Sequence, residues 1–124
     1  MPVRLLTSPV LKWPDAQTVT EAVKRWAEKV IQERPEVVQI GYFGSYARGD
    51  WGVGSDLDLV IILEHTDTPF AMRPSEWDTF ALPVPTDVLV YTRDEWDTLT
   101  TQRQFFQNLA NETVWVYLRL PLER

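Results

Sequence analysis

Apolar residues recur every three or four positions near the start of the chain, a spacing that predicts an amphipathic helix. The apolar stripe comprises Val19, Ala22, Val23, Trp26, Ala27, Val30 and Ile31. Thr18 and Glu21 have the spacing of a capping box, so we expect the helix to begin near Thr18 and to stop at Pro35. A helix with one continuous apolar stripe is suited to cover a sheet.

Shorter runs of β-branched, leucine and aromatic residues predict the strands of that sheet. They span residues 37–43, 56–63, 87–91 and 113–118. Between the second and third runs, residues 64–83 contain three prolines, which indicates a connector with a short helix near residues 75–80.

A second long helix is predicted to begin near Thr92, with Glu95 again at capping-box spacing, and to end near Ala110. Its apolar side comprises Trp96, Leu99, Phe106 and Leu109. The order helix, strand, short helix, strand, connector, strand, helix, strand indicates an α/β (α+β) fold with a mixed sheet. We expect the helices to pack mainly on one face of that sheet.

Length and composition limit the choices further. A chain of 124 residues fits one domain, so we expect residues 1–124 to form a single domain whose proline-punctuated residues 1–15 are extended. The formal net charge of −6 argues against a nucleic acid as the main ligand. The absence of cysteine excludes disulfides, and no apolar run is long enough to span a membrane. A cytoplasmic location is the default expectation.

The chemistry concentrates at two acids that begin the second strand. Asp56 and Asp58 lie two residues apart, so in a strand their side chains leave the same face. Aspartate is disfavoured in strands, and two carboxylates this close repel each other. A divalent cation between them resolves both difficulties, so the pair predicts a metal site.

A glycine-serine turn after the first strand supplies the other half of the pattern. Gly44 allows a tight turn and a close approach of the backbone to a ligand. Ser45 offers a hydroxyl beside backbone N–H groups, an arrangement that suits phosphate oxygens. Arg48 lies on roughly the same side of the following short helix, where we expect it either to contact phosphate or to form a structural ion pair.

These two motifs resemble the signature of the nucleotidyltransferase superfamily, in which Gly-Ser is followed after about ten residues by Asp-x-Asp. More narrowly, Gly44-Ser45-Tyr46-Ala47-Arg48-Gly49 with Ser55-Asp56-Leu57-Asp58-Leu59 resembles the minimal nucleotidyltransferases. The motifs cover residues 44–59, and the compatible order of elements extends to residues 18–118. A lone Gly-Ser or a lone Asp-x-Asp would carry little weight, but both at this spacing make a specific pattern.

The resemblance implies a third carboxylate on a neighbouring strand. Asp87 is the candidate, because it alone among the downstream aspartates begins an apolar strand-like run, although the preceding Pro85 and Thr86 also suit a turn. By the same resemblance, Asp56 and Asp58 bridge two Mg²⁺ ions, and Asp87 holds the catalytic metal. Mg²⁺ commonly takes such ligands together with substrate phosphates.

The implied reaction is the transfer of a nucleotide, AMP from ATP, to a hydroxyl of a protein with release of pyrophosphate. Minimal nucleotidyltransferases often accompany a small helical HEPN-domain protein as antitoxin and toxin, which makes such a protein the expected partner. Two alternatives remain open. One is a non-catalytic module that only binds the partner, and the other is a small-molecule transferase of the antibiotic-modifying kind, which the lack of a second domain disfavours.

Overall fold

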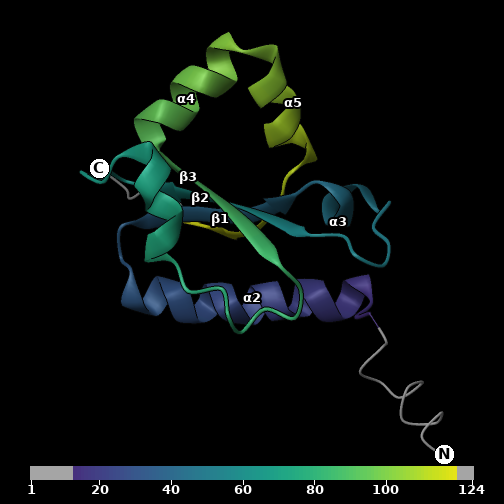
Figure 1. Ribbon diagram of the computed structural model, residues 1–124. Helices are drawn as coiled ribbons and strands as arrows, with labels where there is room; N and C mark the ends of the chain where they lie inside the picture. Colours follow the sequence, from purple (N-terminus) through teal and green to yellow (C-terminus); the bar gives the residue numbers. More distant parts are fainter. Residues whose placement is uncertain (1–12, 120–124) are drawn as a thin grey trace, which may run out of the picture.

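The computed structural model describes residues 13–119, and Figure 1 shows a central sheet between two layers of helix. The elements are α2 (Ala16–Glu33), β1 (Val37–Phe43), α3 (Ser45–Arg48), β2 (Leu57–Leu63), the 3₁₀ helix η2 (Phe70–Glu76), β3 (Thr86–Thr92), α4 (Arg93–Gln102), α5 (Gln104–Glu112) and β4 (Val114–Leu118). The predicted mixed α+β fold is confirmed.

The sheet has the strand order β3-β2-β1-β4 within the described residues. β1 is antiparallel to both β2 and β4, whereas β2 and β3 are parallel. The parallel pair places the start of β3 directly beside the start of β2. Residues that begin these two strands therefore meet at one end of the sheet.

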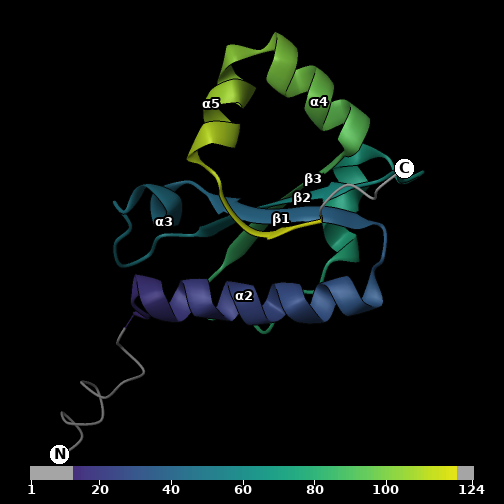
Figure 2. The same cartoon turned by 180° about the vertical axis from the view of Figure 1, so that it is seen from behind.

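Alternation along β2 divides the core into two layers. Leu57, Leu59 and Ile61 are fully buried in the cluster that contains the apolar stripe of α2. Val60 and Ile62 point the other way, into a second cluster with Trp96 of α4 and Leu109 of α5. The views from front and back show α2 along one face and α4 with α5 over the other (Figures 1 and 2). The helices thus cover both faces, which differs from the expected packing mainly on one, because α4 and α5 also have an apolar side to bury.

The first helix begins earlier than its capping-box pattern predicts. Its N-cap is Asp15, whose carboxylate accepts the Thr18 N–H at 2.8 Å. Aspartate is a strong N-cap, so it starts the helix at Ala16 and leaves Thr18 inside the first turn. Of the N-terminal segment that was predicted to be extended, residues 1–12 lie outside the described residues, and residues 13–15 have no regular structure.

The second long helix is divided in two. Thr92 and Glu95 form the predicted capping box, but Arg103 has an extended backbone and separates α4 from α5. The break lets the chain fold back, so that the Trp96 and Phe106 rings lie 6.5 Å apart and both contact Tyr91. In one continuous helix, Trp96 and Phe106 would lie ten residues apart, which corresponds to about 15 Å along the helix axis. Shared aromatic packing against the sheet therefore favours the break.

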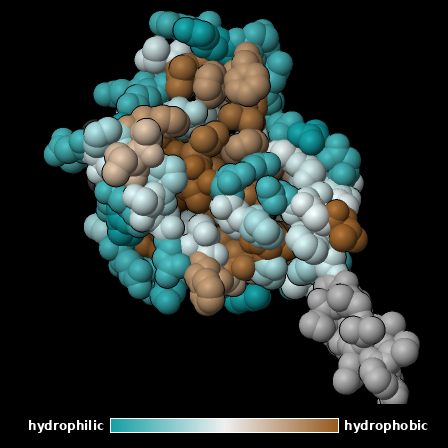
Figure 3. All heavy atoms as spheres, viewed as in Figure 1, coloured by the Kyte–Doolittle hydropathy of each residue, from teal (hydrophilic) through white to brown (hydrophobic). Residues whose placement is uncertain are grey.

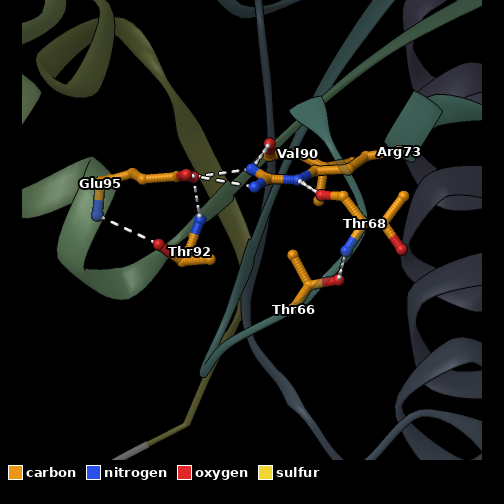
Figure 4. Close-up of polar contacts among 6 residues, drawn as sticks. All are labelled: Thr66, Thr68, Arg73, Val90, Thr92 and Glu95. Carbon is orange, nitrogen blue, oxygen red and sulfur yellow. Dashed lines mark hydrogen bonds and ion pairs between the residues drawn. The ribbon is translucent and has the colours of Figure 1, made fainter. Parts of the chain in front are cut away.

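The connector between β2 and β3 is fixed by a buried arginine (Figure 4). Its short helix is η2, which begins at Phe70 and overlaps the predicted residues 75–80 only at Ser75 and Glu76. Arg73 is only 6% exposed, and its guanidinium forms two bonds to the Glu95 carboxylate, at 2.7 and 3.1 Å. It also donates to the carbonyl oxygens of Thr68 and Val90, at 2.8 and 3.1 Å. These bonds tie η2 to β3 and to the first turn of α4.

Glu95→Gln is expected to destabilise the fold by about 1–3 kcal/mol, because it leaves the buried guanidinium without its carboxylate. The Arg73 hydrogen bond lowers the pKa of Glu95. Folding therefore favours the ionised form of Glu95. The stability that the ionised carboxylate contributes is present above the pKa of Glu95 in the unfolded chain, and it is lost as pH falls through the pKa of Glu95 in the folded protein. Urea unfolding measures the free energy of unfolding of Glu95→Gln and of wild type at pH 7 and at acid pH. The difference between the two proteins should be smaller at acid pH than at pH 7. Asp94→Asn, an exposed change in the same turn of α4, is the control and should have little effect.

In the part of the chain that the structure describes, none of the helices combines the length and apolar character needed to cross a membrane.

Candidate active site

Strand register brings the predicted acids together. Asp58 in β2 is paired directly with Asp87 in β3, and the two strands are parallel. Paired residues of neighbouring strands project from the same face of a sheet, so both carboxylates lie on the face covered by α4 and α5. Asp56, two residues before Asp58, shares this side of the chain. The prediction that Asp87 stands on a strand beside the acid pair is confirmed.

The site holds an excess of negative charge. Partial burial, followed by repulsion from Asp87 and Asp56, raises the pKa of Asp58. Arg48 acts in the opposite direction, and Glu112 adds a further raising effect. The ionised Asp58 is therefore destabilised in the folded protein, and a bound cation would relieve this repulsion.

The glycine-serine turn lies directly against Asp58. Gly44 has a φ of +76°, a conformation that residues with a side chain rarely adopt. A Cβ atom on Gly44 would overlap Oδ2 of Asp58. Gly44 therefore lies directly beside the Asp58 carboxylate, and only glycine permits that approach.

Arg48 of α3 and Glu112 of α5 contact each other beside the glycine-serine turn. Arg48 Nε lies 3.1 Å from the Asp50 carboxylate, and Nη1 lies 3.4 Å from Oε2 of Glu112. The same Glu112 oxygen accepts the Gly44 N–H at 2.7 Å. Arg48 thus forms the ion pairs that were one of its two expected roles, while remaining exposed at the rim.

A pocket of about 640 Å³ contains most of these residues. It is lined by Gly44, Ser45, Arg48, Asp56 and Asp58 together with Phe43, Phe105, Asn108, Leu109 and Glu112. Its volume is in the range of small-molecule sites. One wall comes from the glycine-serine turn and the acids, and the other comes from α5.

A second pocket, of about 530 Å³, adjoins the first at Asp58. Asp58 and Phe43 line both pockets, whereas Asp87 lines only the second. The connector supplies Pro74, Trp77 and Thr79 to this pocket, and β3 supplies Thr86, Val88 and Leu89. Asp58 therefore borders both the pocket that contains the glycine-serine turn and the pocket that contains Asp87.

The α5 residues of the site are absent from the sequence prediction. In the sequence, Glu112 and Asn108 have the spacing of a polar helix face. They reach the glycine-serine turn only because α5 folds back toward α3. For Phe105 the sequence contains a partial indication. Two adjacent phenylalanines in a helix cannot both face the core, so one of Phe105 and Phe106 must be exposed. Phe106 packs against Tyr91 and Trp96, while Phe105 is 69% exposed and lines the pocket.

The loop that joins the turn to the acids is held by local packing. Trp51 stacks on Tyr46, with ring centroids 5.8 Å apart, and the Ser55 hydroxyl accepts the Gly52 N–H at 2.8 Å. Tyr46 is buried, so Trp51 packs locally against the core. This packing holds the loop between Ser45 and Asp56 against the core.

The donor chemistry suits a hard divalent cation, because the acids supply only oxygen atoms and carry unbalanced charge. Among residues 13–119, however, no group of three acidic, histidine or cysteine side chains is arranged so that it could hold a metal ion. Mg²⁺ is commonly held by one or two carboxylates plus substrate phosphates, so a preformed protein cage is not required. The residues therefore fit a cation that arrives with a nucleotide.

Comparison with known proteins agrees with the geometry. Residues 23–112 match the family model described as "Nucleotidyltransferase domain". Among solved structures, the chain resembles the crystal structure of a "putative nucleotidyltransferase" from Sulfolobus solfataricus, with a TM-score of 0.62, 20% sequence identity and 84% of each chain covered. At that identity the likeness concerns the fold alone. A search of curated proteins finds no significant match.

Proposed function

Since the chain belongs to the nucleotidyltransferase domain family, we propose that it transfers AMP from ATP to a hydroxyl group of a protein partner. The acceptor oxygen forms a bond to the α-phosphorus, and the bond from that phosphorus to the bridging oxygen breaks. Pyrophosphate leaves with the electron pair, and the hydroxyl proton passes to Asp87 or to water. No covalent bond to the protein is needed, so positioning and electrostatics provide the catalysis.

The observation that carries this proposal is that Asp58 lines both pockets. In-line displacement needs the nucleophile and the leaving group on opposite sides of the phosphorus. The pocket beside the glycine-serine turn suits the triphosphate. The pocket that contains Asp87 suits the incoming hydroxyl, and its apolar walls suit an aromatic or aliphatic side chain that bears it.

Each site residue then has a definite task. The Gly44 N–H, the Ser45 hydroxyl and Arg48 hold phosphate oxygens. Asp56, Asp58 and Asp87 would hold two Mg²⁺ ions, which when bound neutralise the charge of the phosphates and of the leaving group. Phe105 is exposed and lines this pocket, and in this proposal it would contact the base.

A protein acceptor is favoured by exposed apolar side chains. Figure 3 shows apolar side chains gathered over the sheet below α4 and α5. Phe70, Tyr91 and Leu99 line a shallow and mainly apolar groove together with Asp94, Glu95 and Thr98, and Phe105 is exposed on α5. Exposed apolar groups of this kind mark protein interaction sites. The resemblance to minimal nucleotidyltransferases points to a small helical HEPN-domain protein as the partner.

The test is to co-express the chain with the protein encoded beside it and to measure the intact mass of that protein after incubation with ATP and Mg²⁺. The expected result is the addition of one or more AMP groups, with faster association at low salt if the partner is basic. Stable binding without added mass would favour the non-catalytic alternative. Modification of a free small-molecule antibiotic in place of the protein would favour the small-molecule alternative.

A further inference from the structure

Glu112 stands where helix electrostatics disfavour it. It is the last residue of α5, and the carbonyl end of a helix favours cations. It also adds negative charge to a site where Asp58 already faces Asp56 and Asp87. Core packing does not explain the residue, because the Glu112 side chain is about one-quarter exposed. Its position is explained by what the carboxylate contacts.

Those contacts are two of the groups that the proposed function assigns to phosphate. Oε2 of Glu112 accepts the Gly44 N–H at 2.7 Å and lies 3.4 Å from Nη1 of Arg48. An anionic oxygen held by a backbone N–H and a guanidinium is the arrangement that a phosphate oxygen would adopt. A backbone N–H has one hydrogen to donate, so Glu112 and a phosphate cannot both bind the Gly44 N–H fully.

We propose that Glu112 is an internal anion that closes the glycine-serine turn and must be displaced by the triphosphate of an incoming nucleotide. The proposal rests on the proposed function, because it names the regulation of the same site. In the nucleotide-free protein Glu112 satisfies Gly44 N–H and Arg48. On binding, a phosphate oxygen takes its place.

The exchange requires only a movement of the Glu112 side chain. α5 stays anchored through Leu109, which is buried against the sheet and whose carbonyl oxygen accepts the Thr113 hydroxyl at 2.7 Å. Glu112 lines the same pocket as Ser45 and Asp58, so the released carboxylate remains near the site. The negative charge of Glu112 then repels the triphosphate. This repulsion is stronger for a triphosphate without a cation than for a triphosphate whose charge Mg²⁺ has reduced.

Glu112→Gln tests the proposal, because it keeps the shape of the side chain and removes its charge. A charge-assisted hydrogen bond is roughly twice as strong as a neutral one, so ATP should bind the variant roughly five- to tenfold more tightly than wild type. The measurement is calorimetric titration of the folded protein with ATP, with and without Mg²⁺. The gain should be larger without Mg²⁺. Glu28→Gln, an exposed change on α2 with the same effect on net charge, should leave the affinity unchanged.

Titration with adenosine separates phosphate competition from a general loosening of the pocket. Adenosine has no phosphate, so Glu112→Gln should not alter its binding. Equal ATP affinity in wild type and variant, or weaker binding in the variant, would overturn the role of Glu112 and leave the proposed function standing. Absence of ATP binding in both proteins would overturn the proposed function together with this inference.

Discussion

Asp58→Asn is expected to lower the rate of nucleotide transfer by roughly a hundredfold to a thousandfold or more, the range seen when one charge-stabilising group is removed from an active site. Asp58 is the residue that lines both pockets and is paired in register with Asp87. An asparagine retains the size of the side chain and loses the negative charge that a cation needs. The rate should be measured as pyrophosphate release in the presence of the partner, ATP and Mg²⁺.

The same substitution should make the cation-free protein more stable at neutral pH. Folding raises the pKa of Asp58, chiefly through burial and then through Asp87 and Asp56, so the folded state favours the protonated carboxyl. The stability associated with that proton is fully present below the unfolded pKa and is lost as pH rises through the folded pKa. Asp58→Asn should therefore raise the urea midpoint at pH 7, and the gain should shrink as pH falls into the range where the carboxyl is protonated.

Asp67→Asn is the matched control, because Asp67 is exposed in the connector and the change in net charge is the same. It should alter neither the rate nor the midpoint appreciably. Full activity of Asp58→Asn would contradict the assignment of Asp58 to the reaction. A lower urea midpoint would show that the ionised carboxylate stabilises the fold.

Gly44→Val is expected to abolish nucleotide binding. The backbone of Gly44 has a positive φ, and a Cβ atom would overlap the Asp58 carboxylate, so the turn must move away from the acids. The strained backbone should also cost about 1–3 kcal/mol of stability. Ser45→Ala, by contrast, removes one hydrogen bond to a charged group and should weaken binding by roughly 1–2 kcal/mol.

Calorimetric titration with a non-hydrolysable ATP analogue and Mg²⁺ measures both effects, and circular dichroism checks that each variant is folded. Gly52→Ala is the control, since a Cβ atom there would meet no atom within 4 Å. Unchanged affinity in both Gly44→Val and Ser45→Ala would mean that the phosphates bind elsewhere.

Short-range patterns, together with the family resemblance that required a third carboxylate, predicted which side chains the sheet brings together. A strand places alternate residues on one face, so Asp56 and Asp58 had to share a side. The choice of Asp87 depended on its position at the start of an apolar run, and the parallel pairing of β2 and β3 sets it beside Asp58. Gly44 was predicted from the backbone freedom that such a turn requires, and its positive φ confirms that need.

The helical side of the site could not be predicted in this way. The apolar stripe of residues 92–110 fits one straight helix, and nothing local marks Arg103 as a break. The break follows from tertiary packing, because Trp96 and Phe106 must reach the same Tyr91. Glu112 reaches Gly44 only after this reversal, across a sequence separation of 68 residues. Its role therefore depends on the fold of α5 rather than on any motif.

The assignment of the three acids and the glycine-serine turn to nucleotide transfer is tested most directly by a crystal structure of the protein with Mn²⁺ and a non-hydrolysable ATP analogue, with the metal located by anomalous diffraction. We expect Mn²⁺ bound by Asp58 with Asp56 and Asp87, and the triphosphate against Gly44 and Ser45 with its α-phosphorus where the two pockets meet at Asp58. We also expect that the Glu112 carboxylate no longer accepts the Gly44 N–H. Metal bound away from these three acids, or a nucleotide that leaves the glycine-serine turn vacant, would contradict the proposed function.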